Sequence, residues 1–268
     1  MFPISRPEEP ALSPVAFELA VQDTHGLEVA ARLGADRIEL CSALALGGVT
    51  PSLALVEAAA ATPGIPPVHV LVRPRTGGFA YEPAETATIL QDVRHVLRAG
   101  ASGVVIGGIR DATVDTDLVK RVLDAAGDAP VTFHRAIDTL PDRVTAVETL
   151  AALGVRRVLT SAGATSVADA LPALTALVAA AAGRIEIMAG GGVTVDLVPA
   201  LLRTGVHAVH ASAKRLIPDG LTVGLGTSSP AGPGGRETTD EVTAAAILAA
   251  IRSAGSAGDS AGGLGDAP

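Results

Sequence analysis

The feature that most constrains the fold is an alternation of short apolar runs with helical patterns, repeated eight times along the chain. The predicted strands cover residues 17–21, 37–41, 68–73, 103–107, 130–135, 157–160, 184–188 and 206–211. The helical patterns that follow them cover residues 26–33, 50–61, 83–98, 115–126, 142–153, 166–182, 194–203 and 239–252. Strands that alternate with helices form parallel sheets. Eight such units in 268 residues favour an α/β fold of the closed (β/α)8 type, the TIM barrel, over a doubly wound open sheet.

Composition changes at both ends of the predicted barrel, which we place at residues 15–252 as a single domain. Residues 1–14 form an N-terminal extension without the basic and then apolar pattern of a signal peptide. Residues 218–238 are rich in glycine, serine and proline, and we expect a long loop there. Residues 253–268 are rich in glycine, alanine, serine and aspartate, and we expect a disordered tail.

The overall composition excludes several classes of partner. With 20 basic and 28 acidic residues and 2% aromatic residues, the chain is a poor nucleic-acid binder. Its apolar stretches fall well short of the roughly 20 residues that span a bilayer, so we expect no membrane partner. The only cysteine, Cys41, excludes an intrachain disulfide framework and suits a reducing compartment, which predicts a cytoplasmic protein.

Polar residues gather where the predicted strands end, which is where barrel enzymes carry their active sites. They are Glu39, Cys41, Arg73, Arg75, His134, Arg135, Asp138, Ser161, His210 and Ser212. Charges inside a barrel must be paired or must serve a ligand. Glu18 and Glu39 could pair with Arg73 and Arg135 across the barrel, and a purely structural ion network remains the alternative to a binding site.

A glycine-rich loop, Gly190, Gly191 and Gly192, leaves the seventh predicted strand and enters a helix pattern. Backbone N–H groups in such a loop, with the helix N-terminus, can bind an anion, and Ser212 would add a hydroxyl. The alternative is a tight turn that needs small residues.

The arginines Arg73 and Arg75 lie on the opposite side of the predicted rim, so we expect a ligand with two anionic or polar ends. Arg135, Ser161 and His210 are further candidate ligand contacts. Between the two ends of the ligand, Glu39 and His134, with Asp138, are candidate catalytic residues for proton transfer.

Cys41 ends an apolar strand, where a free cysteine is commonly a small buried hydrophobic residue. As a metal ligand it would suit Cu(I), which prefers thiolate and thioether donors. No CxxC pattern accompanies it, so the residues alone leave both roles open.

Several motifs together resemble one known family, the CutC family, from about residue 17 to residue 214. The motifs are 37–41 (RIELC), 47–52 (GGVTPS), 69–75 (HVLVRPR), 133–136 (FHRA) with Asp138, 159–161 (LTS), 184–188 (RIEIM), 190–193 (GGGV) and 210–212 (HAS). The resemblance implies a cytoplasmic, self-associating TIM barrel, here expected as a homodimer, with a role in copper homeostasis and Cu(I) binding.

Cys41 matches one of the family's proposed Cu(I) ligands, whereas Ala211 stands where a second cysteine often follows the histidine of the eighth strand. The resemblance therefore predicts a copper homeostasis protein with Cu(I) as its cofactor, bound at Cys41. The alternative is a barrel enzyme that acts on a small anionic or phosphorylated metabolite.

Overall fold

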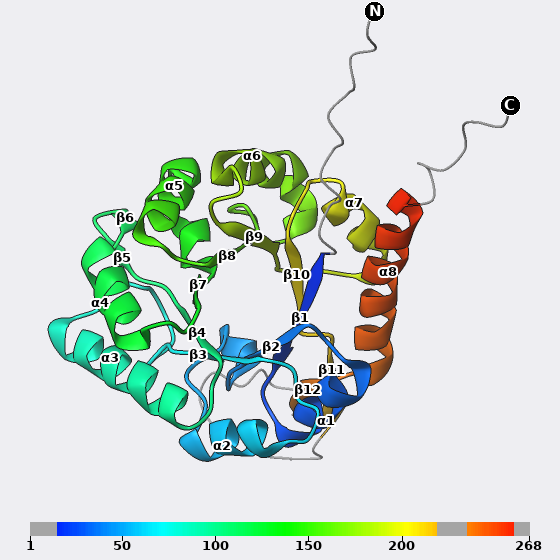
Figure 1. The fold of residues 1–268 in the computed structure, drawn as a ribbon, viewed down its shortest axis with the longest axis horizontal. Helices are drawn as coiled ribbons and strands as arrows, with labels where there is room; N and C mark the ends of the chain where they lie inside the picture. Colours follow the sequence, from blue (N-terminus) through cyan, green and yellow to red (C-terminus); the bar gives the residue numbers. More distant parts are fainter. Residues whose placement is uncertain (1–14, 219–234, 260–268) are drawn as a thin grey trace, which may run out of the picture.

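The computed structural model describes residues 15–218 and 235–259, and it confirms the single-domain (β/α)8 barrel (Figure 1). Eight parallel strands close in the order β1-β10-β9-β8-β7-β4-β3-β2. They are β1 (Ala16–Val21), β2 (Arg37–Leu40), β3 (Val68–Leu71), β4 (Gly103–Ile106), β7 (Val131–Phe133), β8 (Arg157–Thr160), β9 (Glu186–Ala189) and β10 (Ala208–Ala211). Because β1 pairs with both β2 and β10, this sheet has no open edge.

Helices form a ring outside the strands (Figure 1). They are α1 (Thr24–Leu33), α2 (Leu53–Ala61), α3 (Pro83–Arg98), α4 (Thr116–Ala126), α5 (Arg143–Leu153), α6 (Leu171–Ala181), α7 (Val198–Leu202) and α8 (Glu241–Asp259). Their ends follow local chemistry. Asp23 caps α1 by accepting a hydrogen bond from the backbone N–H of Gly26, and Gly34 ends the helix in the left-handed conformation at φ 62°.

In the part of the chain that the structure describes, four 3-10 helices modify the expected pattern: η1 (Leu44–Leu46), η2 (Arg135–Thr139), η3 (Val167–Ala170) and η4 (Val195–Leu197). The predicted helices 166–182 and 194–203 are each divided, η3 leading into α6 and η4 into α7. In both cases a proline occupies the first turn of the α-helix, where its missing N–H group costs no hydrogen bond.

The described residues also form two short antiparallel sheets that the sequence did not predict. β5 (Ile109–Arg110) pairs with β6 (Thr113–Val114), and β11 (Lys214–Pro218) pairs with β12 (Gly235–Thr239). The expected loop 218–238 is therefore shorter, because its last residues pair with β11.

The last helix, α8, reaches Asp259, so the first part of the expected disordered tail is helical. Residues 1–14, 219–234 and 260–268 lie outside the described residues. Within the described chain, no helix has the length and hydropathy needed to cross a membrane.

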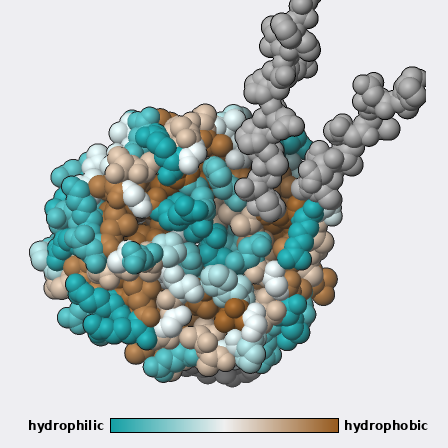
Figure 2. Space-filling view, viewed as in Figure 1, coloured by the Kyte–Doolittle hydropathy of each residue, from teal (hydrophilic) through white to brown (hydrophobic). Residues whose placement is uncertain are grey.

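Alternate strand residues face the helices and the inside of the barrel. Phe17, Leu19 and Ile38 belong to the apolar core between strands and helices. The alternate positions Glu18 and Arg37 are also buried, so the barrel interior holds charges that need partners. Figure 2 shows hydrophilic side chains gathered over the centre of the viewed face, around the barrel axis.

Candidate functional site

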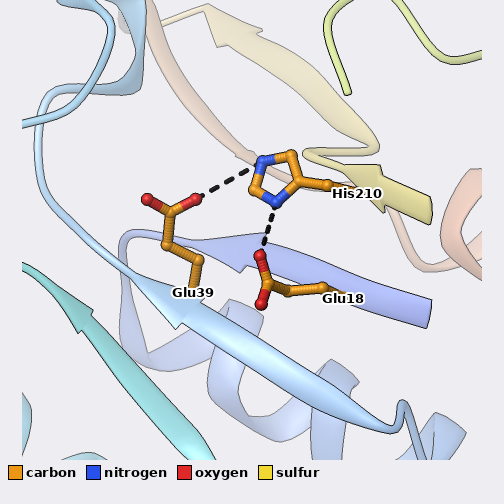
Figure 3. A group of neighbouring side chains, drawn as sticks. All are labelled: Glu18, Glu39 and His210. Carbon is orange, nitrogen blue, oxygen red and sulfur yellow. Dashed lines mark hydrogen bonds and ion pairs between the residues drawn. The ribbon is translucent and has the colours of Figure 1, made fainter. Parts of the chain in front are cut away.

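Three ionisable side chains meet inside the barrel, where β1, β2 and β10 are neighbours (Figure 3). Nδ1 of His210 lies 2.8 Å from Oε1 of Glu18, and Nε2 of the same ring lies 3.4 Å from Oε2 of Glu39. The strand register accounts for the first contact, because Glu18 and His210 are direct partners across β1 and β10. The imidazole therefore bridges two carboxylates that come from different strands.

Arg37 binds the other oxygen of Glu18. Its Nε donates to Oε2 of Glu18, and its Nη2 lies 3.4 Å from the sulfur of Met188. Burial alone would raise the pKa of Glu18, but the hydrogen bond with His210 and the positive charge of Arg37 outweigh burial and hold that pKa far below its ordinary value. Glu18 is therefore a fixed negative charge at neutral pH.

This pairing replaces the expected one with Arg73 and Arg135. Within the described residues, Glu18 forms its salt bridges with Arg37 and His210, and Glu39 forms its own with His210. Arg37 starts β2 directly opposite Glu18, whereas Arg73 and Arg135 lie beyond the ends of their strands.

Glu39 and His210 have pKa values suited to proton transfer. Burial raises the pKa of Glu39 to about 7, opposed by the charge of His210 and assisted by that of Glu18. Burial lowers the pKa of His210, but its hydrogen bond with Glu18 and the nearby negative charges more than compensate, so the pKa lies above its ordinary value. The Glu39–His210 pair can therefore change its protonation near neutral pH, as a general acid or base must.

A pocket of about 140 Å³ opens beside this pair. It collects six of the residues expected from the sequence: Glu39, Cys41, Arg73, His134, Arg135 and His210. The other expected residues do not line it: Arg75, Asp138, Ser161, Gly190, Gly191, Gly192 and Ser212. Part of the predicted set therefore lines one cavity, and the rest of the set lies outside it.

The two arginines after β3 are largely occupied by the protein itself. Arg73 is buried, and its guanidinium donates to the backbone carbonyls of Leu46, Gly48 and Gly77. Arg75 forms a salt bridge with Glu85 and donates to backbone carbonyls of its own loop. Arg73 therefore forms part of the pocket wall, whereas Arg75 stabilises the loop that follows β3.

Arg135 offers a more accessible cation, and Asp138 orients it. Nε of Arg135 donates to Oδ2 of Asp138 at 2.8 Å, and Nη2 donates to Oγ of Ser161 at 2.7 Å. Asp138 also accepts hydrogen bonds from the hydroxyl of Thr160 and the backbone N–H of Gly163. With so many donors around its carboxylate, Asp138 acts as an anchor for Arg135 and for the loop after β8.

The glycine loop after β9 makes room for Arg135. The N–H of Gly190 donates to the carbonyl of Thr160 in the strand ladder. Gly191 has a φ of +100°, and a Cβ there would lie 2.9 Å from Nη1 of Arg135. The following helix, α7, has five residues, and Ser212 lies half-buried after β10. The tight-turn interpretation of this loop therefore has direct structural support.

One group of side chains in the described chain could hold a metal ion. Glu18, Glu39 and His210 each offer one ligand atom, and these atoms lie within 4.8 Å of one another. Carboxylate and imidazole donors suit harder ions than Cu(I), and both oxygens of Glu18 already have protein partners. The contacts of this group are therefore those of an ion-pair network and not those of a preformed metal site.

Cys41 is the soft donor of the pocket. Its side chain is buried beside Leu71 and Val105, and its sulfur lies 3.7 Å from the carbonyl oxygen of Val21. Burial, with the negative charge of Glu39, raises the pKa of the thiol well above its ordinary value. The sulfur of Met188 is the contact of Arg37, so the described residues supply no second free soft donor, and they do not fit a closed Cu(I) site.

Sequence reasoning missed several residues of the site, among them Arg37 and Phe79. Arg37 shares strand parity with Glu39 and Cys41, and this signal could have identified it as the partner of Glu18. Phe79 lines the pocket from the loop after β3, and no periodic pattern marks it.

Comparison with known proteins places this fold in a family. The sequence model of the CutC family matches residues 15–215. A family protein CutC from Aliivibrio fischeri is 39% identical over 223 residues, which cover 79% of this chain and 90% of that protein. One from Sinorhizobium medicae is 42% identical over 151 residues, which cover 56% of this chain and 61% of that relative. The chain thus spans about three fifths of the length of this second relative.

Two solved structures share the fold of this chain. A structure described as the putative copper homeostasis protein CutC from Streptococcus agalactiae has a TM-score of 0.70 and 30% identity, covering 74% of this chain and 98% of that chain. QR15, an aldolase, shares the barrel fold with a TM-score of 0.56 and 16% identity, covering 73% of this chain and 89% of that one. The match of the family model over most of the barrel shows that this chain belongs to the CutC family.

Proposed function

We propose that this protein is an enzyme that binds a small anionic metabolite in the pocket and transfers a proton to or from it, with Glu39 as the proton carrier. The observation that carries the proposal is the buried Glu39 carboxyl, whose pKa is raised to about 7 by burial, in contact with His210. A group half-protonated at neutral pH serves equally well as acid and base. A buried carboxyl with a strongly shifted pKa that lines a pocket is a candidate functional group.

The surroundings of Glu39 support this role. Glu18 accepts from one ring nitrogen of His210 and fixes the ring orientation, so the other nitrogen faces Glu39. Arg37 keeps Glu18 ionised. Protons can thus pass between Glu39 and His210 while Glu18 retains its charge.

Arg135 is the proposed anchor for the anionic end of the ligand. Asp138 and Ser161 bind its Nε and Nη2, and Nη1 has no hydrogen-bond partner among the described residues. A planar guanidinium held in this way can receive a carboxylate or phosphate oxygen without first losing side-chain freedom.

The test is proton exchange in D2O, followed by NMR on a panel of small carboxylates and phosphorylated carbonyl compounds. We expect the wild-type chain to accelerate exchange of a carbon-bound proton in at least one compound. Glu39→Gln should slow that exchange by about 100-fold or more, because it removes the proton carrier. Glu57→Gln, at an exposed position of α2, is the matched control and should leave the rate unchanged. Equal rates for Glu39→Gln and the wild type would refute the proposal.

A second candidate is Cu(I) binding in copper homeostasis, favoured by the description of the Streptococcus agalactiae relative and by Cys41 in the pocket wall. Because the described residues offer one thiol, a Cu(I) complex here would need a soft ligand from outside the described residues. Competition with a Cu(I) chelator tests it: the wild type should withdraw copper in a 1:1 ratio and Cys41→Ser should not. Failure of the wild type to compete would remove this candidate.

A homodimer and a cytoplasmic location complete the proposal. Both rest on the resemblance to the family, and the single cysteine adds to the argument for a reducing compartment. Light scattering coupled to size-exclusion chromatography tests the first, and cell fractionation tests the second.

A further inference from the structure

His134 carries a hydrogen-bond donor that the protein does not use. Nδ1 of its ring accepts the backbone N–H of Ala136 at 3.1 Å, so the proton of the neutral ring is on Nε2. Nε2 is buried and has no hydrogen-bond partner among the described residues, and the residue as a whole is 6% exposed. An unpaired buried donor is costly, which points to a partner that arrives with a ligand.

The ring stays neutral at every working pH. Burial, assisted by the positive charge of Arg73, lowers the pKa of His134 to about 3. A neutral imidazole with Nδ1 engaged cannot act as a base through Nε2, because that nitrogen already holds a proton. His134 is therefore a permanent donor, whereas Glu39 and His210 are the groups that exchange protons.

The surroundings fix the ring in the pocket wall. A Cβ at Gly107 would lie 2.2 Å from Cε1 of His134, so only glycine leaves room for the ring. The Phe79 ring lies 5.0 Å from the His134 ring, centroid to centroid, and Cζ of Arg73 lies 5.1 Å from the same Phe79 centroid. His134 and Arg73 thus both contact one aromatic ring, and the charge of Arg73 makes this side of the pocket electropositive.

We infer that the Nε2–H of His134 binds a carbonyl oxygen of the ligand, next to the charge of Arg73, and that the ligand is a small carboxylate bearing such a carbonyl. The inference rests on the proposed function for the rest of the site, with the carboxylate on Arg135 and proton transfer through Glu39. An acceptor is required, because His134 and Arg73 offer only donors to the ligand.

The size of the pocket limits the ligand further. Its volume of about 140 Å³ compares with cavities of about 150 Å³ that hold benzene, a molecule of six non-hydrogen atoms. Pyruvate has six non-hydrogen atoms and both required groups, and propionate is the same molecule without the carbonyl oxygen. The two form a matched pair of probes.

The experiment titrates the full-length chain with pyruvate and with propionate by calorimetry. We expect the wild type to bind pyruvate about 10-fold more tightly, the effect of one hydrogen bond to a buried donor. His134→Asn keeps an acceptor for the N–H of Ala136, but its shorter amide NH2 group does not reach the former Nε2 position, so it should abolish the preference. His134→Gln places an amide donor near the former Nε2 and should restore part of it.

Equal affinity of the wild type for the two probes, or no measurable binding of pyruvate, overturns the inference. If either variant fails to fold, the wild type alone decides: the ¹⁵N-edited signal of the His134 Nε2–H group should shift on addition of pyruvate and not of propionate. Loss of this preference with Glu39-dependent exchange intact would reject the inference but not the proposed function. A preserved preference without such exchange would reject the proposed function alone.

Discussion

Nε2 of His210 lies 3.4 Å from a carboxylate oxygen of Glu39. The positive charge of a protonated His210 lowers the pKa of Glu39, and the negative charge of an ionised Glu39 raises the pKa of His210. The pair titrates as a unit, so its apparent pKa values belong to the pair and not to either residue alone.

Replacing Glu39 should change how stability depends on pH. Burial raises the pKa of Glu39 from 4.5 to about 7, so the folded state holds this proton more tightly than the unfolded state. The stabilisation is complete below pH 4.5 and is lost as pH rises to about 7, an effect on the order of 3 kcal/mol at most. Glu39→Gln should therefore be more stable relative to wild type at pH 8 than at pH 5, as measured by urea unfolding.

The comparison between wild type and variant matters because other groups titrate in the same range. Burial lowers the pKa of His69 to about 4, and this effect makes the wild type gain stability as pH rises. Subtracting the curves cancels that contribution. An identical pH dependence for Glu39→Gln and wild type would show that the Glu39 pKa is not raised.

The buried pair of Arg37 and Glu18 should be sensitive to removal of one partner. Arg37→Met leaves the Glu18 carboxylate with only His210 to balance it in a dry interior, and should destabilise the fold by about 3 kcal/mol. The matched control is Arg32→Met, since Arg32 pairs with Glu241 at the surface and should leave the unfolding midpoint near that of wild type.

Adding Glu18→Gln to Arg37→Met removes the unpaired charge, so the double variant should recover part of the lost stability. Urea unfolding of the four proteins at pH 7 gives the comparison. Equal effects of Arg37→Met and Arg32→Met would mean that water reaches the Arg37–Glu18 pair.

The barrel itself was predictable from the sequence, because strand and helix periodicities and cap residues such as Asp23 and Gly34 are local signals. The location of the site followed from the barrel, since functional residues gather at the strand ends. The pairing inside the barrel did not follow. It depends on which residue lies opposite Glu18 across two neighbouring strands, and a single sequence does not contain the register.

The orientation of loop residues was also beyond the sequence. Arg73 and Arg75 are two positions apart and look equivalent in the sequence. Backbone carbonyls hold Arg73 in the pocket wall, whereas Arg75 pairs with Glu85 and does not line the pocket. Gly191 suggested an anion cradle by composition, whereas the space it leaves belongs to Arg135. Such choices are made by tertiary contacts.

The thiol of Cys41 should react slowly with thiol reagents in the native protein. The side chain is buried, and burial with the charge of Glu39 raises the pKa of the thiol well above its ordinary value, so little thiolate is present at pH 8. We expect reaction with an aromatic disulfide reagent at least about 100-fold slower in buffer than in denaturing urea. Rapid stoichiometric reaction of the native chain would contradict this and would strengthen the Cu(I) candidate, which needs the thiolate.

Gly107→Ala should disturb the site mainly through His134, with a further close contact of 2.9 Å to Cβ of Ala136. The added Cβ would lie 2.2 Å from Cε1 and 2.4 Å from Nδ1 of that ring, closer than any real contact, so the ring must move. Overpacking of this kind costs about 1–3 kcal/mol and displaces the Nε2–H donor from the pocket wall. We therefore expect a lower thermal midpoint together with loss of the preference for pyruvate over propionate. Gly78→Ala is the matched control, because nothing lies within 4 Å of its added Cβ, and it should change neither quantity. A Gly107→Ala variant with wild-type stability and an unchanged preference would mean that the His134 ring does not pack against Gly107 and does not donate to the ligand from there.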